Sequence, residues 1–230
     1  AVGVIVPASA NAKAHWDARG QKLPNLAPRL EGEKESAGLG GGDFNVVALN
    51  DDAFKALKNV PDGTAVKFSG DLAAVEKSYT WNAVGIMRGS SKVLGKQAIL
   101  LTAHLDHLGV GRPVKGDDIY NGADDDASGT TAVVSLAKYY RKLNNNARTL
   151  IFVAFTAEEI GEYGSQYFAT SVDPDKVVAM FNIEMIGKAS KWGQNSAFIT
   201  GFERSDFGTI LQKNLEGTAF KFYPDPYPDQ

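Results

Sequence analysis

The pattern of apolar and polar positions changes its texture near Tyr79. Beyond this residue, short apolar runs typical of strands alternate with stretches in which apolar residues recur at helical spacing. This alternation predicts an α/β fold with a mixed, mostly parallel sheet flanked by helices on both sides. The predicted helices cover 126–143, 162–170 and 205–215, and the predicted strands are WNAVGIMRG (81–89), QAILLTA (97–103), RTLIFVAF (148–155), VVAMFNI (177–183) and SAFIT (196–200).

Further expectations concern the burial of two of these strands and the segments that form no helix or strand. RTLIFVAF is an almost unbroken apolar run, which is typical of a strand buried on both faces, and we interpret VVAMFNI as another core strand. Residues 105–124 are expected to form a long loop. The last nine residues, FYPDPYPDQ, contain three prolines and are expected to form no regular element.

Residues 1–78 predict a smaller, β-rich module, which separates the chain into domains 1–78 and 79–230. Val2 to Val6 reads as a buried strand, and DDAFKALKN (51–59) as a short helix with acidic residues in its first turn. The other predicted strands of this module are FNVVALN (44–50), TAVKFSG (64–70) and residues 71–77.

Composition narrows the classes of function. The net charge of −3 and the lack of a Lys/Arg cluster argue against a nucleic-acid partner, and no apolar run is long enough to span a bilayer. Cysteine is absent, so any metal must be held by nitrogen and oxygen. PASA (7–10) resembles a small-residue cleavage site, but no charged region precedes it and the apolar run before it is short. Because the sequence starts abruptly within a predicted strand, we interpret the chain as a mature or trimmed form, and we predict a secreted or periplasmic location.

Six polar residues share one kind of position, directly after an apolar run or in the loop that precedes a helix. In an open α/β sheet, loops at the carboxyl ends of parallel strands meet in one crevice. One imidazole and several carboxylates in such a crevice predict a metal site. The six residues are His104, Asp106, Asp125, Glu158, Glu159 and Glu184.

Each candidate also has a structural interpretation. A lone histidine after a strand, such as His104, is about as often structural as a ligand, and Asp106 either fixes the His104 tautomer or is a turn residue. Within Asp124, Asp125 and Asp126, one aspartate is enough to cap the following helix, and three adjacent carboxylates repel one another unless a cation is near. Gly122 and Gly129 permit tight turns and close helix packing here.

The remaining candidates follow the later strands. Glu158 and Glu159 either mark the exit of a strand to solvent or divide two tasks, one binding metal and the other acting as general base. Glu184 follows a buried run, so its charge needs a partner, either a metal or a buried Arg or Lys. His15 is interpreted as a surface residue, and His107 as a supporting or loop residue.

With these residues in place, the chain resembles the M28 zinc metallopeptidases, the co-catalytic aminopeptidases. The segments that carry the resemblance occur in the family's order over roughly residues 79–215, and GADD-x-ASG and AEE-x-G are its specific elements. DFNVVALNDDAFKAL and WNAVGIMRGS resemble the later part of a protease-associated (PA) domain. The M28-like segments are TAHLDHLG (102–109), NGADDDASGTTAV (121–133), RTLIFVAFTAEEIGEYGS (148–165) and FNIEMIG (181–187).

The resemblance implies a role for each matching residue. His104 would bind one zinc, Asp125 would bridge two zinc ions, and Glu159 would bind the second. Glu158 would be the general base and Asp106 would orient His104. The family often has a cis peptide bond after the bridging aspartate, which makes Asp125–Asp126 the candidate for it.

Two departures from the family pattern stand out. Glu184 occupies a position where the family usually has Asp. The family's last ligand is a histidine well downstream of this position, and no histidine follows His107. We therefore expect the chain to be truncated at its C-terminal side relative to the family, with three ligands for the first zinc and only Asp125 and Glu159 for the second.

The activity that the resemblance implies is zinc-dependent hydrolysis of peptide bonds at a free N-terminus, with peptides as substrates. Two alternatives remain open: a glutaminyl-cyclase-like enzyme that uses a single zinc, and a non-catalytic relative that binds peptides or proteins. The intact AEE sequence (157–159) favours the peptidase.

Overall fold

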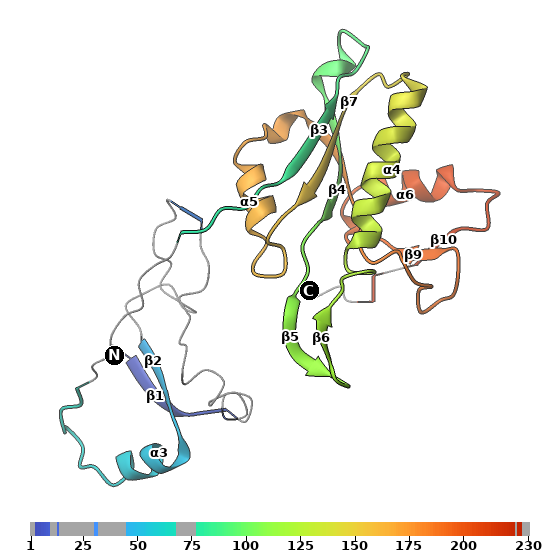
Figure 1. Ribbon diagram of the computed structural model, residues 1–230. Coiled ribbons are helices and arrows are strands. Elements are labelled where there is room, and N and C mark those ends of the chain that lie inside the picture. The colour runs from blue at the N-terminus through green and yellow to red at the C-terminus, as the bar shows by residue number, and fades with distance from the viewer. Residues whose placement is uncertain are drawn as a thin grey trace. The chain divides into compact units, whose positions relative to one another are not determined.

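The chain divides into two compact units, Ala1–Ser78 and Tyr79–Gln230. The computed structural model (Figure 1) describes residues 3–9, 13, 30–31, 45–67, 77–223 and 225–226. Among these residues, no helix combines the length and the apolar character needed to cross a membrane. The candidate site lies entirely in the second unit, so its fold is treated at greater length.

The first unit contains a parallel pair of strands, β1 (Gly3–Pro7) and β2 (Asn45–Leu49), followed by helix α3 (Asp51–Leu57). The predicted short helix with acidic residues in its first turn is thus confirmed, and Asn50 caps it by accepting a hydrogen bond from the Ala53 N–H at 2.9 Å. Two expectations were wrong: Val4 exposes 41% of its surface and so is not buried, and residues 64–67 form no strand. Residues 68–76 lie outside the described part of the chain, and the PA-like assignment stays a prediction.

The second unit is built on a four-stranded sheet in the order β3-β7-β4-β8 (Figure 1). The three strands β7, β4 and β8 are parallel, and β3 joins the edge antiparallel to β7. The predicted mixed, mostly parallel sheet is therefore confirmed. The strands span Ala83–Met87 (β3), Ala98–His104 (β4), Thr149–Phe155 (β7) and Val177–Asn182 (β8).

Helices cover both faces of this sheet, and each begins and ends within two residues of its predicted limits. Helix α4 (Ala127–Leu143) packs on one face, where its Val133 joins alternate residues of β4 and β7 in the core. Helix α5 (Tyr163–Ala169) reaches the other face, where Phe168 meets Phe155 with ring centroids 5.5 Å apart. Helix α6 (Phe207–Asn214) contacts β8 through Phe207 and Phe181. The core residues are Leu101, Ala103, Val133, Leu150 and Phe152.

Three sequence-based expectations about strands were wrong. β8 is an edge strand among the described residues and alternates between half-buried and exposed positions, because only β4 pairs with it. β9 (Ser196–Phe198) lies outside the main sheet and pairs with β10 (Lys221–Tyr223), which begins the segment expected to be irregular. The predicted loop after β4 contains a hairpin of β5 (Gly109–Val114) and β6 (Asp117–Tyr120).

Candidate metal centre

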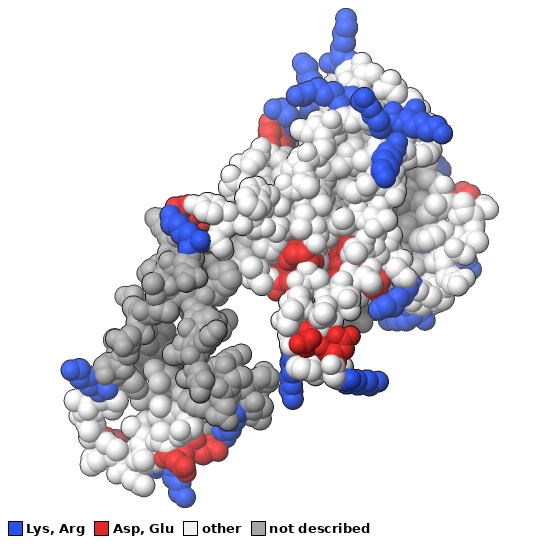
Figure 2. All heavy atoms as spheres, viewed as in Figure 1, with Lys and Arg blue, Asp and Glu red and all other residues white. Residues whose placement is uncertain are grey.

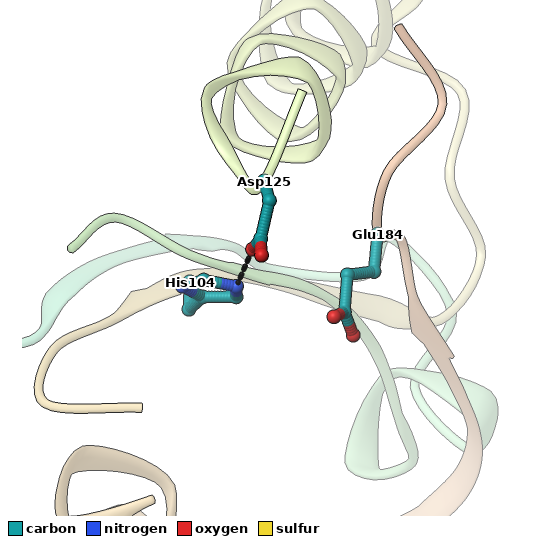
Figure 3. A group of neighbouring side chains, drawn as sticks. All are labelled: His104, Asp125 and Glu184. Carbon is teal, nitrogen blue, oxygen red and sulfur yellow. Dashed lines mark ion pairs between the residues drawn. The ribbon is translucent and has the colours of Figure 1, made fainter. Parts of the chain in front are cut away.

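The carboxyl ends of the three parallel strands bring the predicted site residues together. His104 is the last residue of β4, Asp125 lies in the turn before α4, and Glu184 follows β8 by two residues. Figure 3 shows these three side chains, which come from separate segments and surround a common point. One nitrogen or oxygen atom from each lies within 4.8 Å of the others. The expected convergence of distant segments is therefore present in the fold.

The imidazole of His104 is buried, with 4% of its side chain exposed. Its Nε2 atom lies 3.0 Å from Asp125 Oδ1, yet it is a buried polar atom without a hydrogen-bond partner among the described residues. Buried polar groups are normally paired, and an unpaired one needs an explanation. A cation bound by both His104 and Asp125 would explain why Nε2 has no hydrogen-bond partner.

The other ring nitrogen fixes the tautomer of His104. Nδ1 lies 3.0 Å from the backbone carbonyl of Asp106, and because a carbonyl only accepts, Nδ1 donates and leaves Nε2 free to bind. The carboxylate of Asp106 is farther away, at 3.8 Å. It accepts instead from the backbone N–H groups of Glu158 and Glu159, at 3.2 and 3.4 Å. Asp106 thus holds His104 through its main chain and the two glutamates through its side chain.

A second group of donors adjoins the first. His107, Asp125 and Glu159 each place one donor atom within 4.8 Å of the others. His107 Nδ1 contacts Glu159 Oε1 and lies 3.9 Å from Asp125 Oδ2. Asp125 therefore turns one oxygen toward each group, which is the geometry of a bridging carboxylate. Sequence analysis interprets His107 as a supporting or loop residue instead of a ligand.

The acidic triplet divides into three separate roles. Asp125 faces the two histidines, while Asp124 accepts from the Gly187 N–H at 2.8 Å and pairs with Lys188 at 3.1 Å. Asp126 caps α4 by accepting from the Gly129 N–H at 3.0 Å. The expectation that capping explains only one of the three aspartates agrees with this arrangement.

Asp126 does more than cap the helix. Only 1% of it is exposed, and its second oxygen accepts from the backbone N–H of His104 at 3.2 Å. The oxygen that caps α4 also accepts from the Met185 N–H at 3.2 Å. One buried carboxylate therefore joins the backbone at His104, at the start of α4 and beside Glu184. Sequence reasoning missed this role.

Gly129 lets α4 approach the end of β8 closely. A Cβ atom at this position would lie 2.0 Å from the Ile183 carbonyl oxygen and 2.5 Å from Asp126 Oδ1, which is too close for any side chain. The predicted close packing at Gly129 is thereby confirmed. It sets the separation between the turn that carries Asp125 and the segment that carries Glu184.

The backbone around the site departs from ordinary geometry. The Asp125–Asp126 peptide bond is cis, as the resemblance implied. Ala157, just before Glu158, and Met185, just after Glu184, have positive φ angles of 56° and 51°. Strained residues of this kind concentrate at functional sites.

Comparison with known proteins identifies the family. The model of peptidase family M28 matches residues 82–230. The chain belongs to this family. The resemblance carried by the HLDH, GADDDASG and AEE segments is thus confirmed, and the matched range covers every residue of the two donor groups described above.

Individual proteins match the chain over shorter spans. Leucine aminopeptidase 2 of Trichophyton rubrum is 31% identical over 121 residues, which are 50% of this chain and 21% of that protein. The vacuolar membrane protease of Schizosaccharomyces pombe is 36% identical over 135 residues, 59% of this chain and 13% of that protein. Aminopeptidase YwaD of Bacillus subtilis is 23% identical over 170 residues, 73% and 32% of the two chains.

Among solved structures, the aminopeptidase from Aneurinibacillus sp. strain AM-1 is similar with a TM-score of 0.44 and 23% identity, over 63% of this chain and 34% of that chain. The chain spans about a fifth of the length of the leucine aminopeptidases that it matches, 21% in each case.

Negative charge gathers at the candidate metal centre. On the face shown in Figure 2, acidic side chains of the second unit surround the end of the sheet that carries the site, whereas Lys and Arg gather at the opposite end. Arg141 and Lys142 in the last turn of α4 belong to that opposite end. This separation favours a cation at the centre.

The shifted pKa values reflect the same excess of carboxylates. Glu184 is an exposed residue, yet partial desolvation of its carboxyl group raises its pKa, and the nearby carboxylates raise it further against the opposing effect of His104. The pKa values of Glu158 and Asp126 are also raised, in both cases chiefly by burial. Burial lowers the pKa of His104, but the carboxylates around it, led by Glu158, raise it above its ordinary value.

The raised pKa of Glu184 predicts a pH-dependent effect of Glu184→Gln on the metal-free chain. A carboxyl group whose folded pKa is raised stabilises the fold below its ordinary value of 4.5 and loses that contribution as the pH rises through the folded pKa. Without metal, Glu184→Gln should therefore become more stable than the wild type as the pH rises above 4.5. Chelated samples melted across this range check it.

The matched control is Glu216→Gln, an exposed change that should leave the pH dependence unchanged. A Glu184→Gln variant that became less stable than the wild type with rising pH would contradict the assigned direction. Added zinc should reverse the order of stabilities, because an ion held by the ionised carboxylate of Glu184 would stabilise the wild type and not the variant.

Proposed function

We propose that the chain carries the catalytic centre of a zinc-dependent peptidase that releases residues from the free N-terminus of peptides. The observation that carries the proposal is the buried, unpaired Nε2 of His104, which faces the carboxylates of Asp125 and Glu184. Family M28 membership supports the same chemistry.

The donor set of the first group suits zinc. One imidazole nitrogen and two carboxylate oxygens are ligands that zinc prefers when cysteine is absent. Two donors bound to one tetrahedral zinc lie about 3.3 Å apart, and the 3.0 Å separation of His104 Nε2 and Asp125 Oδ1 is close to this value. Three protein ligands leave a coordination position open, as catalytic rather than structural zinc sites do.

Glu158 is placed to act as the general base. Its Oε2 atom lies 4.0 Å from His104 Nε2, and about a third of its side chain is exposed, so it can reach both the centre and the solvent. Its raised pKa brings it nearer to neutrality, where a base can both take and return a proton. Glu158 would take a proton from the attacking water and pass it to the leaving amine. When bound, zinc polarises the scissile carbonyl and lowers the pKa of that water.

Preference for a free N-terminus is supported by the surplus of negative charge. The centre combines two histidines with the carboxylates of Asp125, Glu158, Glu159 and Glu184, which suits an α-ammonium group as well as a metal. Two of the named relatives are aminopeptidases. Leucine is the first N-terminal residue to test, because one relative is named for it.

The test compares leucine p-nitroanilide with its N-acetylated form. The zinc-loaded chain should hydrolyse only the substrate with the free amine, lose this activity on chelation and recover it when zinc is returned. Equal turnover of both substrates would contradict the aminopeptidase assignment and indicate an endopeptidase.

The two alternatives predict different results in the same experiment. A glutaminyl-cyclase-like enzyme would convert an N-terminal glutamine peptide to its pyroglutamyl form and leave the leucine substrate intact. A non-catalytic binding relative would hydrolyse neither substrate and contain no stoichiometric zinc. Location outside the cytoplasm and a PA-like character of residues 1–78 remain part of the proposal, supported by sequence pattern alone.

A further inference from the structure

We infer that the end of the second unit opposite the candidate metal centre is a docking surface for anionic lipid membranes. The inference goes beyond the proposed function and does not depend on it. Figure 2 shows Lys and Arg side chains gathered at this end, where Figure 1 places the last turn of α4 and the connection from β3 to β4. We call this surface the basic end, and its residues are Arg88, Lys92, Lys96, Arg141, Lys142 and Arg148.

The fold assembles the basic end from segments that are distant in the sequence. Arg88 directly follows β3, and Arg148 directly precedes the neighbouring antiparallel strand β7. The 3-10 helix η1 (Leu94–Lys96) leads into β4, which starts beside the start of β7. Arg141 and Lys142 lie in the last turn of α4. The sequence shows no Lys/Arg cluster because only the sheet topology brings these cations to one end.

Hydrogen bonds fix the backbone beneath the cations. The side-chain amide of Asn146 donates to the backbone carbonyls of Arg88 and Arg148, at 3.1 and 2.9 Å. Its own backbone carbonyl accepts from the Ser90 N–H at 2.9 Å. The Thr149 hydroxyl donates to the Gly95 carbonyl at 2.8 Å. The segments that carry the cations are therefore joined to one another, and the basic end is a property of the fold.

No carboxylate neutralises the basic end. Residues 78–105 and 127–157, which contain β3, β4, β7 and α4, include no Asp or Glu. Within the described part of the chain, no ion pair involves any of the six cations, and Arg148 donates to the neutral side-chain oxygen of Gln97 at 2.8 Å. Like charges repel, so this arrangement in a chain of net charge −3 favours a negatively charged partner.

The dipole of α4 explains only two of the cations. Arg141 and Lys142 lie in its last turn, where positive charge stabilises a helix. Arg88 and Lys92 lie between β3 and η1, where no α-helix ends. Helix stability therefore does not account for the basic end as a whole.

Exposed apolar side chains distinguish a lipid surface from other polyanions. Val93 is 76% exposed and lies between Lys92 and Lys96. Leu143, the last residue of α4, is 43% exposed and follows Lys142. Apolar side chains flanked by cations are stabilised at the boundary between lipid headgroups and acyl chains, whereas the phosphates of a nucleic acid offer Val93 no apolar surroundings. The combination favours anionic lipids.

Docking through the basic end leaves the candidate metal centre in the aqueous phase. Helix α4 begins beside the centre, where Asp126 caps it, and ends at the basic end 17 residues later. At a rise of 1.5 Å per residue, the two ends of this helix are about 25 Å apart. A chain docked in this way keeps its centre open to molecules in solution.

Vesicle sedimentation tests the inference. The 230-residue chain should bind vesicles of phosphatidylcholine mixed equally with phosphatidylglycerol but not vesicles of phosphatidylcholine alone, and added salt should release it. Arg141→Gln/Lys142→Gln should weaken binding about 30-fold, because each cation near an anionic membrane strengthens binding about 5-fold. The matched control, Arg112→Gln/Lys115→Gln, removes one Arg and one Lys from the exposed β5–β6 hairpin at the other end (Figure 1) and should bind like the wild type.

A second variant tests the contact with lipid. Val93→Ser keeps every charge and should weaken binding about 10-fold, because the apolar side chain no longer gains by leaving water. Its matched control is Val110→Ser in β5, since Val110 is also 76% exposed but lies outside the basic end. This control should bind the vesicles as tightly as the wild type.

The outcomes are distinct. Equal binding to both kinds of vesicle, or binding to neither, would overturn the inference. Equal losses in Arg141→Gln/Lys142→Gln and Arg112→Gln/Lys115→Gln would show that the basic end is not the docking surface. Wild-type binding by Val93→Ser would make the basic end a site for polyanions in general and overturn the assignment to lipid. None of these outcomes bears on the metal centre.

Discussion

Glu158→Gln is expected to reduce kcat for leucine p-nitroanilide by about 10²–10⁴-fold, the range that a general base contributes. The amide keeps the size of the side chain but cannot accept the proton of the attacking water. Zinc content should stay unchanged, because Glu158 belongs to neither of the two donor groups. Activity assays and metal analysis on the same preparation check both parts.

Glu216→Gln makes the same chemical change at an exposed position beyond α6 and should retain full activity. Loss of a zinc ion from Glu158→Gln would reassign Glu158 as a ligand. An unchanged kcat would remove it from the mechanism altogether. The raised pKa of Glu158 also predicts that activity falls as the pH drops below the pKa of this carboxyl, since only the ionised form can act as the base.

Asp126→Asn is expected to cost roughly 3 kcal/mol of folding free energy, because buried donors are left without an acceptor. Both carboxylate oxygens accept backbone N–H groups, from Gly129, Met185 and His104. An amide would turn its NH₂ group toward at least one of these donors. For a unit of this size, such a loss corresponds to a decrease in Tm of roughly 6–12 °C.

The same substitution should also weaken zinc binding, by about 10–100-fold as other changes behind a ligand shell do. Asp126 fixes the backbone at His104 and beside Glu184, so its loss lets these two ligands drift apart. Asp118→Asn, an exposed change in the β5–β6 hairpin, should alter neither Tm nor metal affinity. A zinc affinity unchanged in Asp126→Asn would reduce its role to helix capping.

Much of the site was predictable because strand–helix alternation fixes where strand ends meet. Once β4, β7 and β8 are parallel neighbours, residues directly after them share one edge of the sheet. The placement of His104, Glu158 and Glu184 at this edge follows from the strand arrangement alone. The acidic triplet required more, because sequence alone could show that one aspartate caps α4 but not that Asp126 is this residue and Asp125 the one that faces His104.

His107 and the hairpin after β4 were missed for local reasons. Whether His107 faces the cluster depends on the turn that follows His104 and on the space left at Gly122, and neither leaves a periodic signal. In the hairpin, every residue of β5 and all but one of β6 are exposed, so no apolar alternation marks the two strands. Its two-residue turn has positive φ at Lys115 and Gly116, and Lys-Gly is a weaker hairpin signal than Asn-Gly.

The edge position of β8 could not be predicted from the sequence either. VVAMFNI reads as a core strand because its residues are apolar on both faces, yet Val178 and Met180 are each 46% exposed. An apolar composition shows that a strand can be buried, while its neighbours in the sheet decide whether it is.

Anomalous X-ray scattering at the zinc edge, from crystals of the zinc-loaded chain, tests the central claim most directly. We predict a peak at about 2.0–2.2 Å from His104 Nε2 and from a carboxylate oxygen of both Asp125 and Glu184. Crystals without a peak among these atoms, with His104, Asp125 and Glu184 turned toward solvent, would contradict the metal centre and with it the proposed peptidase activity.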